Sequence, residues 1–202
     1  MRKFKTILKK IGLKRQNTPL YNDILISNKT ITIGKGTAIE KLSISIQVSK
    51  ESNNMISIGN DSIIEGQIIL YSEKARIQIG NRVFIGPNTT LFCYDSIEIE
   101  DDVMISWGCT LIDTNAHSLI SSERSSDVLD WKNGNTFKNW SNVISKPVVI
   151  ERNAWIGFNT IIMKGVTIKE ATVIAAGSVV TKSTKSYSIY GGNPAKFLKQ
   201  TS

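Results

Sequence analysis

The sequence is poor in the residues that build metal and disulfide sites. Among its 202 residues there is one histidine, His117, and there are two cysteines, Cys93 and Cys109. One histidine cannot supply the three imidazole ligands of a catalytic zinc site, and two cysteines form neither a disulfide framework nor a thiolate metal site. We therefore expect no bound metal, and two free thiols in a reducing compartment.

Long apolar segments are also missing. The longest uncharged apolar runs are only a few residues, far short of the roughly 20 that span a bilayer. The basic N-terminal segment is not followed by the apolar region and small-residue cleavage site of a signal peptide. We therefore expect a cytoplasmic protein.

Positive charge is concentrated at the N-terminus. The net charge is +8, and seven Lys and Arg residues without an acid lie in residues 1–16, so the remainder carries +1. A nearly neutral body argues against binding to nucleic acid. Apolar residues at helical spacing predict a short amphipathic helix in residues 1–20. That helix either caps the open end of the next domain or contacts the inner membrane face, and the two roles are compatible.

A six-residue repeat dominates the rest of the chain. Ile or Val recurs without interruption at six positions, namely Ile150, Ile156, Ile162, Ile168, Ile174 and Val180. This period predicts a parallel β-helix in which three flat sides close a coil of about 18 residues. The repeat is weaker from Ile31 to His117, where some spacings of 20 or 21 residues suggest small bulges at the corners. The period does not determine the handedness of the coils.

The repeat defines the expected domains. We expect a β-helix domain in residues 21–182, interrupted by an inserted loop at about 118–148, and a tail in residues 183–202 that packs on the last coil. The loop is polar and lacks the repeat, and a long insertion in a rigid solenoid is more often functional than decorative.

The last coils resemble a known family. The segment AWIGFNTIIMKGVTIKEATVIAAGSVVTK, followed by GGNPAKFLK, is similar to the hexapeptide-repeat acyltransferases. It is closest to the branch of maltose, galactoside and surface-polysaccharide O-acetyltransferases. The resemblance extends from about Ile79 to Lys199. It implies an all-β, left-handed parallel β-helix that assembles as a homotrimer, with acetyl-CoA in a groove between subunits.

His117 is the candidate catalytic base. It lies six residues after Leu111, where the ladder calls for an aliphatic residue, and it matches a DTxxH-like segment of the family. A neutral imidazole can accept a hydroxyl proton near neutral pH. We expect His117 to deprotonate the acceptor hydroxyl, which then attacks the thioester of acetyl-CoA. Asp113, which we prefer, or Asn115 would orient the ring.

Neither cysteine is expected to act as a nucleophile instead. Cys109 falls at the small inward position of its hexapeptide, whereas Cys93 falls on the outer side without a recognisable base. An activated thiolate needs such a base or a positive environment.

The resemblance also assigns contacts with acetyl-CoA. It places Trp155 near the active-site cleft and the backbone of Phe158 against the pantetheine arm. Ala176 lies in a small-residue segment that lets this arm approach the backbone. Four residues would approach the nucleotide end, where the lysines meet its phosphates: Thr181, Lys182, Lys196 and Lys199.

Recognition of the acceptor is less clearly encoded. Many relatives carry an asparagine that helps to hold the acceptor, and this chain has Gly86 in that place. Trp131 and Trp140 in the inserted loop suit the C–H faces of sugar rings. They could equally pin the loop onto a neighbouring subunit.

Together these features predict an acetyl-CoA-dependent O-acetyltransferase that modifies a sugar hydroxyl of a bacterial surface polysaccharide or its precursor. A lipid-linked acceptor would agree with a basic arm at the inner membrane face. Two alternatives remain open. One is transfer to a small soluble acceptor such as an antibiotic, an amino acid or an amino sugar, and the other is a non-catalytic β-solenoid that only binds.

Overall fold

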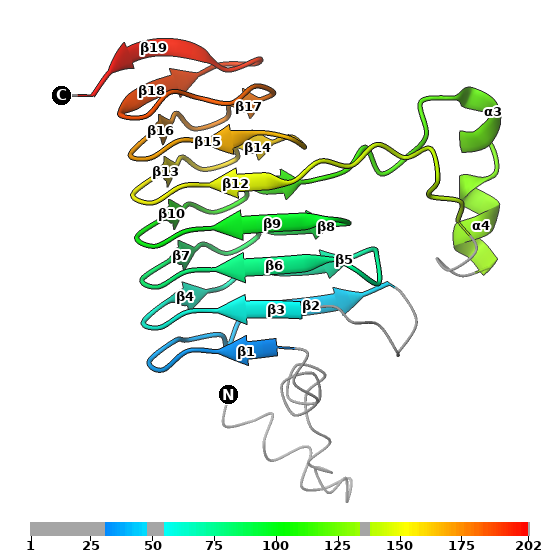
Figure 1. Ribbon diagram of the computed structural model, residues 1–202, viewed down its shortest axis with the longest axis horizontal. Helices are drawn as coiled ribbons and strands as arrows, with labels where there is room; N and C mark the ends of the chain where they lie inside the picture. The colour runs from blue at the N-terminus through cyan, green and yellow to red at the C-terminus, as the bar shows by residue number, and fades with distance from the viewer. Residues whose placement is uncertain (1–30, 48–54, 134–137, 202) are drawn as a thin grey trace, which may run out of the picture.

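The computed structural model describes residues 31–47, 55–133 and 138–201. The amphipathic helix expected in residues 1–20 lies outside these ranges, as do the membrane contact through residues 1–16 and the start of the expected β-helix domain. The described chain is a three-sided solenoid with one projecting arm (Figure 1).

Three sheets form the sides of the solenoid, which we name faces A, B and C. Face A contains β1 (Ile31–Ile33), β3 (Met55–Ile58), β6 (Arg76–Ile79), β9 (Ser96–Ile99), β12 (Val148–Ile150) and β15 (Thr167–Ile168). Face B contains β4 (Ile63–Ile64), β7 (Phe84–Ile85), β10 (Met104–Ile105), β13 (Trp155–Ile156), β16 (Val173–Ile174), β18 (Ser188–Gly191) and β19 (Lys196–Gln200). Face C contains β2 (Ser43–Ile46), β5 (Gln67–Leu70), β8 (Thr90–Cys93), β11 (Thr110–Ile112), β14 (Ile161–Ile162) and β17 (Val179–Val180).

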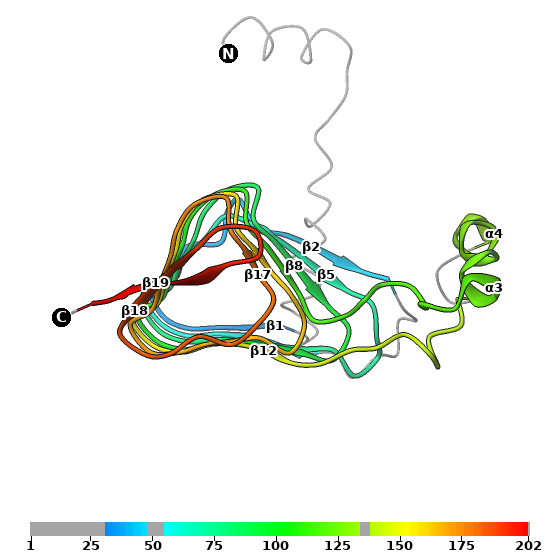
Figure 2. The ribbon, with the colours of Figure 1, turned by 90° about the horizontal axis from the view of Figure 1, so that it is seen from above.

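The coils wind left-handed. In Figure 2, which looks down on the C-terminal end, the chain passes clockwise from face A to face B to face C while it rises toward the viewer. This hand is opposite to the usual crossover between parallel strands. The left-handed parallel β-helix implied by the family resemblance is therefore confirmed.

Equivalent residues of successive coils pair in register. On face B, Ile85 pairs with Ile105, and Ile105 pairs with Ile156 across the whole insertion. Some of the extra residues of the early coils lie at a corner, as their spacing suggested, because residues 71–75 connect β5 to β6 where only residues 94–95 connect β8 to β9. The other extra residues lengthen the strands, since β5 and β8 have four residues whereas β14 and β17 have two.

The inward side chains form one continuous apolar core. Ile77, Ile97 and Val148 on face A are buried, as are their counterparts on the other two faces. Both cysteines belong to this core, so the outward placement expected for Cys93 is wrong. Burial raises the pKa of both thiols, which makes neither of them a ready nucleophile.

The corner between faces A and B is built from repeated side-chain caps. The Oδ1 atom of Asn81 accepts the backbone N–H of Asn60, and Oδ1 of Asp101 accepts the N–H of Asn81, both at 2.8 Å. Gly59 lies beside these caps, and a Cβ atom there would come within 2.6 Å of the backbone of Gly80. The corner therefore needs glycine for close stacking and short polar side chains for capping.

The chain leaves the solenoid after β11 and returns at β12. Between them, residues 113–133 and 138–147 form the arm, which carries α3 (Ser121–Arg124) and α4 (Asp127–Asn133) and projects from the corner between faces C and A (Figures 1 and 2). Thr114 and Ser145 form an isolated antiparallel β-bridge at its base. His117 therefore does not occupy an inward position of the ladder, because the ladder has already ended.

The tail continues face B. β18 pairs in parallel with β16, and β19 folds back antiparallel to β18. Within the described residues, no helix is long and apolar enough to cross a membrane.

We predict that Ile97→Ala lowers the free energy of unfolding by about 2–5 kcal/mol, because it leaves a cavity in the stacked core. Its neighbour Glu98 points outward from the same strand and is exposed. Glu98→Ala should change the free energy by no more than about 0.5 kcal/mol. Denaturant titration of both variants measures the difference, and equal effects would contradict the inward and outward assignment.

Candidate functional site

The imidazole of His117 is held by a carboxylate of the arm. Its Nδ1 forms a hydrogen bond with Oδ2 of Asp127, in the first turn of α4. An ionised carboxylate can only accept, so Nδ1 carries a proton, and in the neutral ring the free lone pair is then on Nε2. The ring itself remains 35% exposed. His117 is thus arranged to accept a proton from a ligand at Nε2.

A buried lysine supports the same carboxylate. The side chain of Lys138 is 1% exposed, and its Nζ donates to Oδ2 of Asp127 at 3.0 Å and to the carbonyl oxygen of Ala116. Nζ also lies 3.3 Å from Nδ1 of His117. Burial raises the pKa of Asp127, but the hydrogen bonds from His117 and Lys138 outweigh burial and hold the pKa below its usual value.

Asp127 takes the place at Nδ1 that the sequence suggested for Asp113. The Asp113 carboxylate is fully buried and accepts the backbone N–H groups of Tyr94 at 2.8 Å and Asp95 at 2.7 Å. It therefore fastens the turn between β8 and β9. Asn115 lies at the base of the arm, where its N–H donates to the carbonyl oxygen of Ile144.

The two tryptophans of the arm differ in their surroundings. Trp131 is exposed and stands edge-on to His117, with ring centroids 5.1 Å apart. Trp140 packs on Tyr94 at 4.6 Å and on Tyr71 at 5.7 Å. Trp140 thus anchors the arm to face C of its own chain, whereas Trp131 remains available to a ligand beside the base.

An exposed aromatic pair lies at the corner between faces B and C. The rings of Trp107 and Phe158 stack at 5.0 Å and are nearly parallel, yet they are 53% and 42% exposed. Ala176 lies in the equivalent turn of the next coil. A Cβ atom built on Gly157 would lie 2.6 Å from the backbone nitrogen of Ala176, so the two turns pack closely. We call Trp107, Phe158 and Ala176 the corner ledge.

Trp107 was not predicted as a site residue, although the repeat places it in line with Phe158. Ile105 pairs with Ile156, and Trp107 and Phe158 each follow two residues later. Aligning the coils across the insertion would have shown the pair. The other unpredicted residues, Asp127 and Lys138, lie in the arm, where no repeat relates them to a position.

The remaining predicted cofactor residues are exposed. Trp155 projects from the outer side of β13, and Thr181 and Lys182 follow β17. Lys196 and Lys199 are exposed on β19.

Gly86 is required by packing. A Cβ atom at this residue would lie 2.9 Å from the backbone nitrogen of Trp107 and 3.0 Å from the carbonyl carbon of Ser106. A larger side chain would therefore push the next coil away.

One chain does not bring the two groups together. His117 contacts α4 in the arm, and α4 lies on the opposite side of the solenoid from β13 and β19 (Figures 1 and 2). If His117 and the residues of face B act on one ligand, the second group must come from another copy of the chain.

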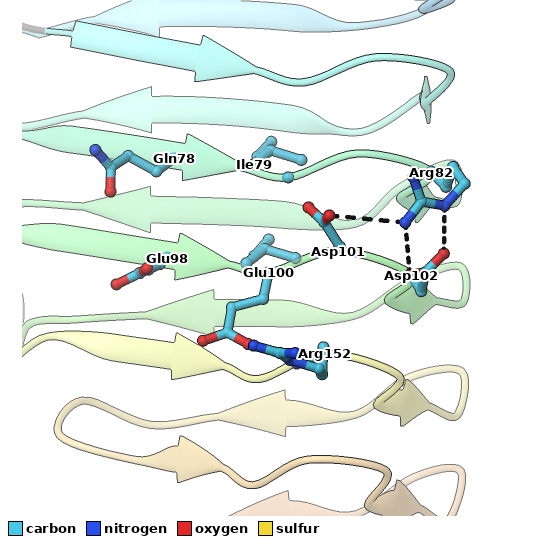
Figure 3. Close-up of a pocket in the computed structure, with 10 residues that line it drawn as sticks. Gln78, Ile79, Arg82, Glu98, Glu100, Asp101, Asp102 and Arg152 are labelled. Carbon is cyan, nitrogen blue, oxygen red and sulfur yellow. Dashed lines mark hydrogen bonds and ion pairs between the residues drawn. The ribbon is translucent and has the colours of Figure 1, made fainter.

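A separate cleft of about 510 Å³ lies on face A (Figure 3). Its arginines are already paired, since Arg82 bonds Asp102 at 2.6 Å and Arg152 lies 3.7 Å from Glu100. We assign this cleft no chemistry. Across the described ranges, no group of three or more His, Cys, Asp or Glu side chains could hold a metal ion.

Two family models match the solenoid. The model described as "Bacterial transferase hexapeptide (six repeats)" matches residues 147–182, and "Hexapeptide repeat of succinyl-transferase" matches residues 76–112. These matches lie on either side of the arm and include both turns that carry the aromatic pair.

Two curated relatives are similar in sequence. The galactoside O-acetyltransferase of Escherichia coli is 29% identical over 144 residues, which is 71% of this chain and 63% of the relative. A probable macrolide acetyltransferase of Lysinibacillus sphaericus is 56% identical over 52 residues, 26% of this chain and 29% of the relative. The chain therefore spans less than two thirds of the length of either relative.

Solved structures share the fold. A mutant of AntD, an N-acyltransferase from Bacillus cereus in complex with dTDP and coenzyme A, has a TM-score of 0.65 at 24% identity, covering 91% of this chain and 90% of that one. The polySia-specific acetyltransferase NeuO has a TM-score of 0.56 at 25% identity, covering 84% and 85%.

We predict that Asp113 makes the stability of the protein depend on pH. Burial raises its pKa from 3.8 to about 6, although the N–H groups of Tyr94 and Asp95 act in the opposite direction. The folded state thus binds the proton more tightly than the unfolded chain does. The stabilisation is complete below pH 4 and is lost as the pH rises through 6, a loss of about 3 kcal/mol at roughly 1.4 kcal/mol per pKa unit.

Denaturant titrations between pH 4 and pH 7 test this. Asp113→Asn has no titrating carboxyl at this position, so the stability of wild type relative to the variant should be greatest near pH 4. The difference in the free energy of unfolding between wild type and Asp113→Asn should decrease as the pH rises. A gap that does not change with pH would show that this carboxyl is not the titrating group.

Proposed function

Because the chain belongs to the hexapeptide-repeat family of bacterial transferases, we propose that it is an acetyl-CoA-dependent O-acetyltransferase. Its acceptor is a sugar hydroxyl, in a bacterial surface polysaccharide or its precursor. The observation that carries the proposal is the arrangement at His117. Asp127 holds the Nδ1 proton, and Trp131 stands exposed beside the ring.

His117 acts as the general base of this reaction. Nε2 takes the proton from the acceptor hydroxyl as its oxygen bonds to the thioester carbonyl carbon. The carbon–sulfur bond then breaks, and the sulfur of coenzyme A leaves with the proton that His117 returns. Asp127 stabilises the imidazolium that forms between these two transfers, as the carboxylate of a catalytic triad does.

The corner ledge suits the donor. An extended, largely apolar pantetheine arm fits against exposed aromatic rings and against small residues that keep the backbone accessible. Exposed lysines on the tail, Lys196 and Lys199, offer charges for the phosphates at the nucleotide end. Thr181 and Lys182 are proposed to act beside them.

A homotrimer would bring the two groups together, with the arm of one subunit against the ledge of the next. The arm exposes apolar side chains that its own chain leaves uncovered, among them Leu119, Val128 and Leu129. Face B exposes an apolar column as well, formed by Ile63, Met104 and Trp155. Exposed apolar surfaces of this kind are typical of subunit interfaces.

The acceptor is argued from the relatives and from Trp131. A galactoside O-acetyltransferase and a polySia-specific acetyltransferase share the sequence pattern and the fold, respectively, and an indole face suits a sugar ring. A cytoplasmic protein whose basic residues 1–16 contact the inner membrane face would meet lipid-linked acceptors. A macrolide is a second candidate, since a 52-residue segment is 56% identical to part of a probable macrolide acetyltransferase.

The activity test measures coenzyme A release from acetyl-CoA with polysaccharides, nucleotide sugars, galactosides and macrolides as acceptors. We expect a carbohydrate to stimulate release and His117→Ala to lower kcat by about 100- to 10,000-fold, the usual contribution of a general base. Near-normal turnover of His117→Ala, in the same oligomeric state as wild type, would reject the mechanism. Turnover with a macrolide and with no carbohydrate would favour the second acceptor.

The shared site can be tested by complementation. His117→Ala lacks the base, and Ala176→Trp should block the ledge, so each variant alone should be inactive. If the site forms between subunits, mixed oligomers contain some intact sites, and coexpression should restore about a quarter of the wild-type activity. A site within one chain would give no restoration, and the mass of the assembly measured by light scattering should match three chains.

A further inference from the structure

Among the described lysines and arginines, Lys138 is the one whose charged side chain is buried. Only 1% of its side chain is exposed, and lysine is almost never buried in this way without a partner. The solenoid does not need it, because Lys138 lies in the arm. Its position beside the proposed base suggests a role in that chemistry.

The ammonium group joins three parts of the arm. Nζ donates to the carbonyl oxygen of Ala116, the residue before His117, and to Oδ2 of Asp127 on α4. It also lies over the rings of Trp131 at 5.2 Å and Trp140 at 4.8 Å. Cation–π contacts of this kind stabilise an ammonium group that has lost its water.

The same position controls what Asp127 can do. The side chain of Asp127 is only 8% exposed. A buried carboxylate without a counter-charge tends to take up a proton. A protonated Asp127 would donate its hydrogen bond to Nδ1 instead of accepting one. The ring would then carry its proton on Nε2, where it could not act as a base.

We propose that Lys138 is a positioning residue that fixes the tautomer of His117 through Asp127. By keeping Asp127 ionised, it keeps the ring proton on Nδ1 and the lone pair on Nε2. Partner groups of this kind commonly determine which nitrogen of a histidine is available. The catalytic consequence rests on the proposed function, whereas the tautomer is a property of the free protein.

The single histidine makes the tautomer directly measurable. In tag-free protein labelled with ¹⁵N-histidine, only His117 contributes ring signals. Wild type should show a protonated Nδ1 and an unprotonated Nε2. Lys138→Met, which keeps the length of the side chain and loses its charge, should shift the population toward the Nε2–H form.

Two further variants separate charge from packing. Lys138→Arg is bulkier but keeps a donor for Asp127, so it should retain the Nδ1–H form. Lys132→Met removes an exposed lysine of the same arm and should behave as wild type. If Lys138→Met keeps the Nδ1–H form, or if Lys138→Arg loses it as well, the proposal is overturned.

Kinetics provide the second measurement. Lys138→Met should lower kcat by about 10- to 100-fold, while KM for acetyl-CoA changes by less than about twofold, because the ledge is unaltered. The double variant Asp127→Asn/Lys138→Met should lose no more activity than Asp127→Asn alone, since Lys138 acts through Asp127. Losses that multiply would show an independent role and contradict the proposal. If wild type transfers no acetyl group, the proposed function fails, and the NMR measurement still decides the role of Lys138.

Discussion

The in-register stacking of parallel coils is the constraint from which the rest of the structure follows. Neighbouring strands lie about 4.8 Å apart, so each coil must match the next residue by residue. Aliphatic side chains then fill the interior, and corners admit only glycine or short capping side chains. Gly86 is likewise held to glycine by the coil that follows it.

This constraint also explains why the polar chemistry lies outside the solenoid. A stack of identical coils has no interior space for a base, its carboxylate and a counter-ion. The arm provides that space on its own small scaffold, where Lys138 and Asp127 satisfy each other beside His117. Trp140 packs on Tyr94 and Tyr71, which follow strands of face C, and these contacts attach the arm to the solenoid.

The separation of the corner ledge from the arm bears on how subunits could assemble. The corner ledge lies between faces B and C, and the arm that carries His117 leaves the solenoid between faces C and A. Neither surface resembles a complete site, and both leave apolar side chains exposed. A symmetric assembly repeats both surfaces and can unite them without any change of conformation, which suits a rigid fold.

Much of this could be predicted from residues alone, because periodicity is local. The six-residue spacing of Ile150 to Val180 determined the β-helix and its inward column, and the lone His117 stood out as a titratable residue at the break. Trp131 was also recognised there. The partner of His117 was not predicted. The nearby Asp113 is buried and instead accepts hydrogen bonds from the turn between β8 and β9. Asp127 and Lys138 reach the ring only through the folding of the arm, so their contact with His117 is not encoded by local spacing. The sequence by itself determined the repeat and the core and singled out His117 as the candidate base, since each depends on spacing along the chain. Only the tertiary structure decided the hand of the coils, the pairing of Trp107 with Phe158 and the environment of the base, since these depend on residues far apart in sequence.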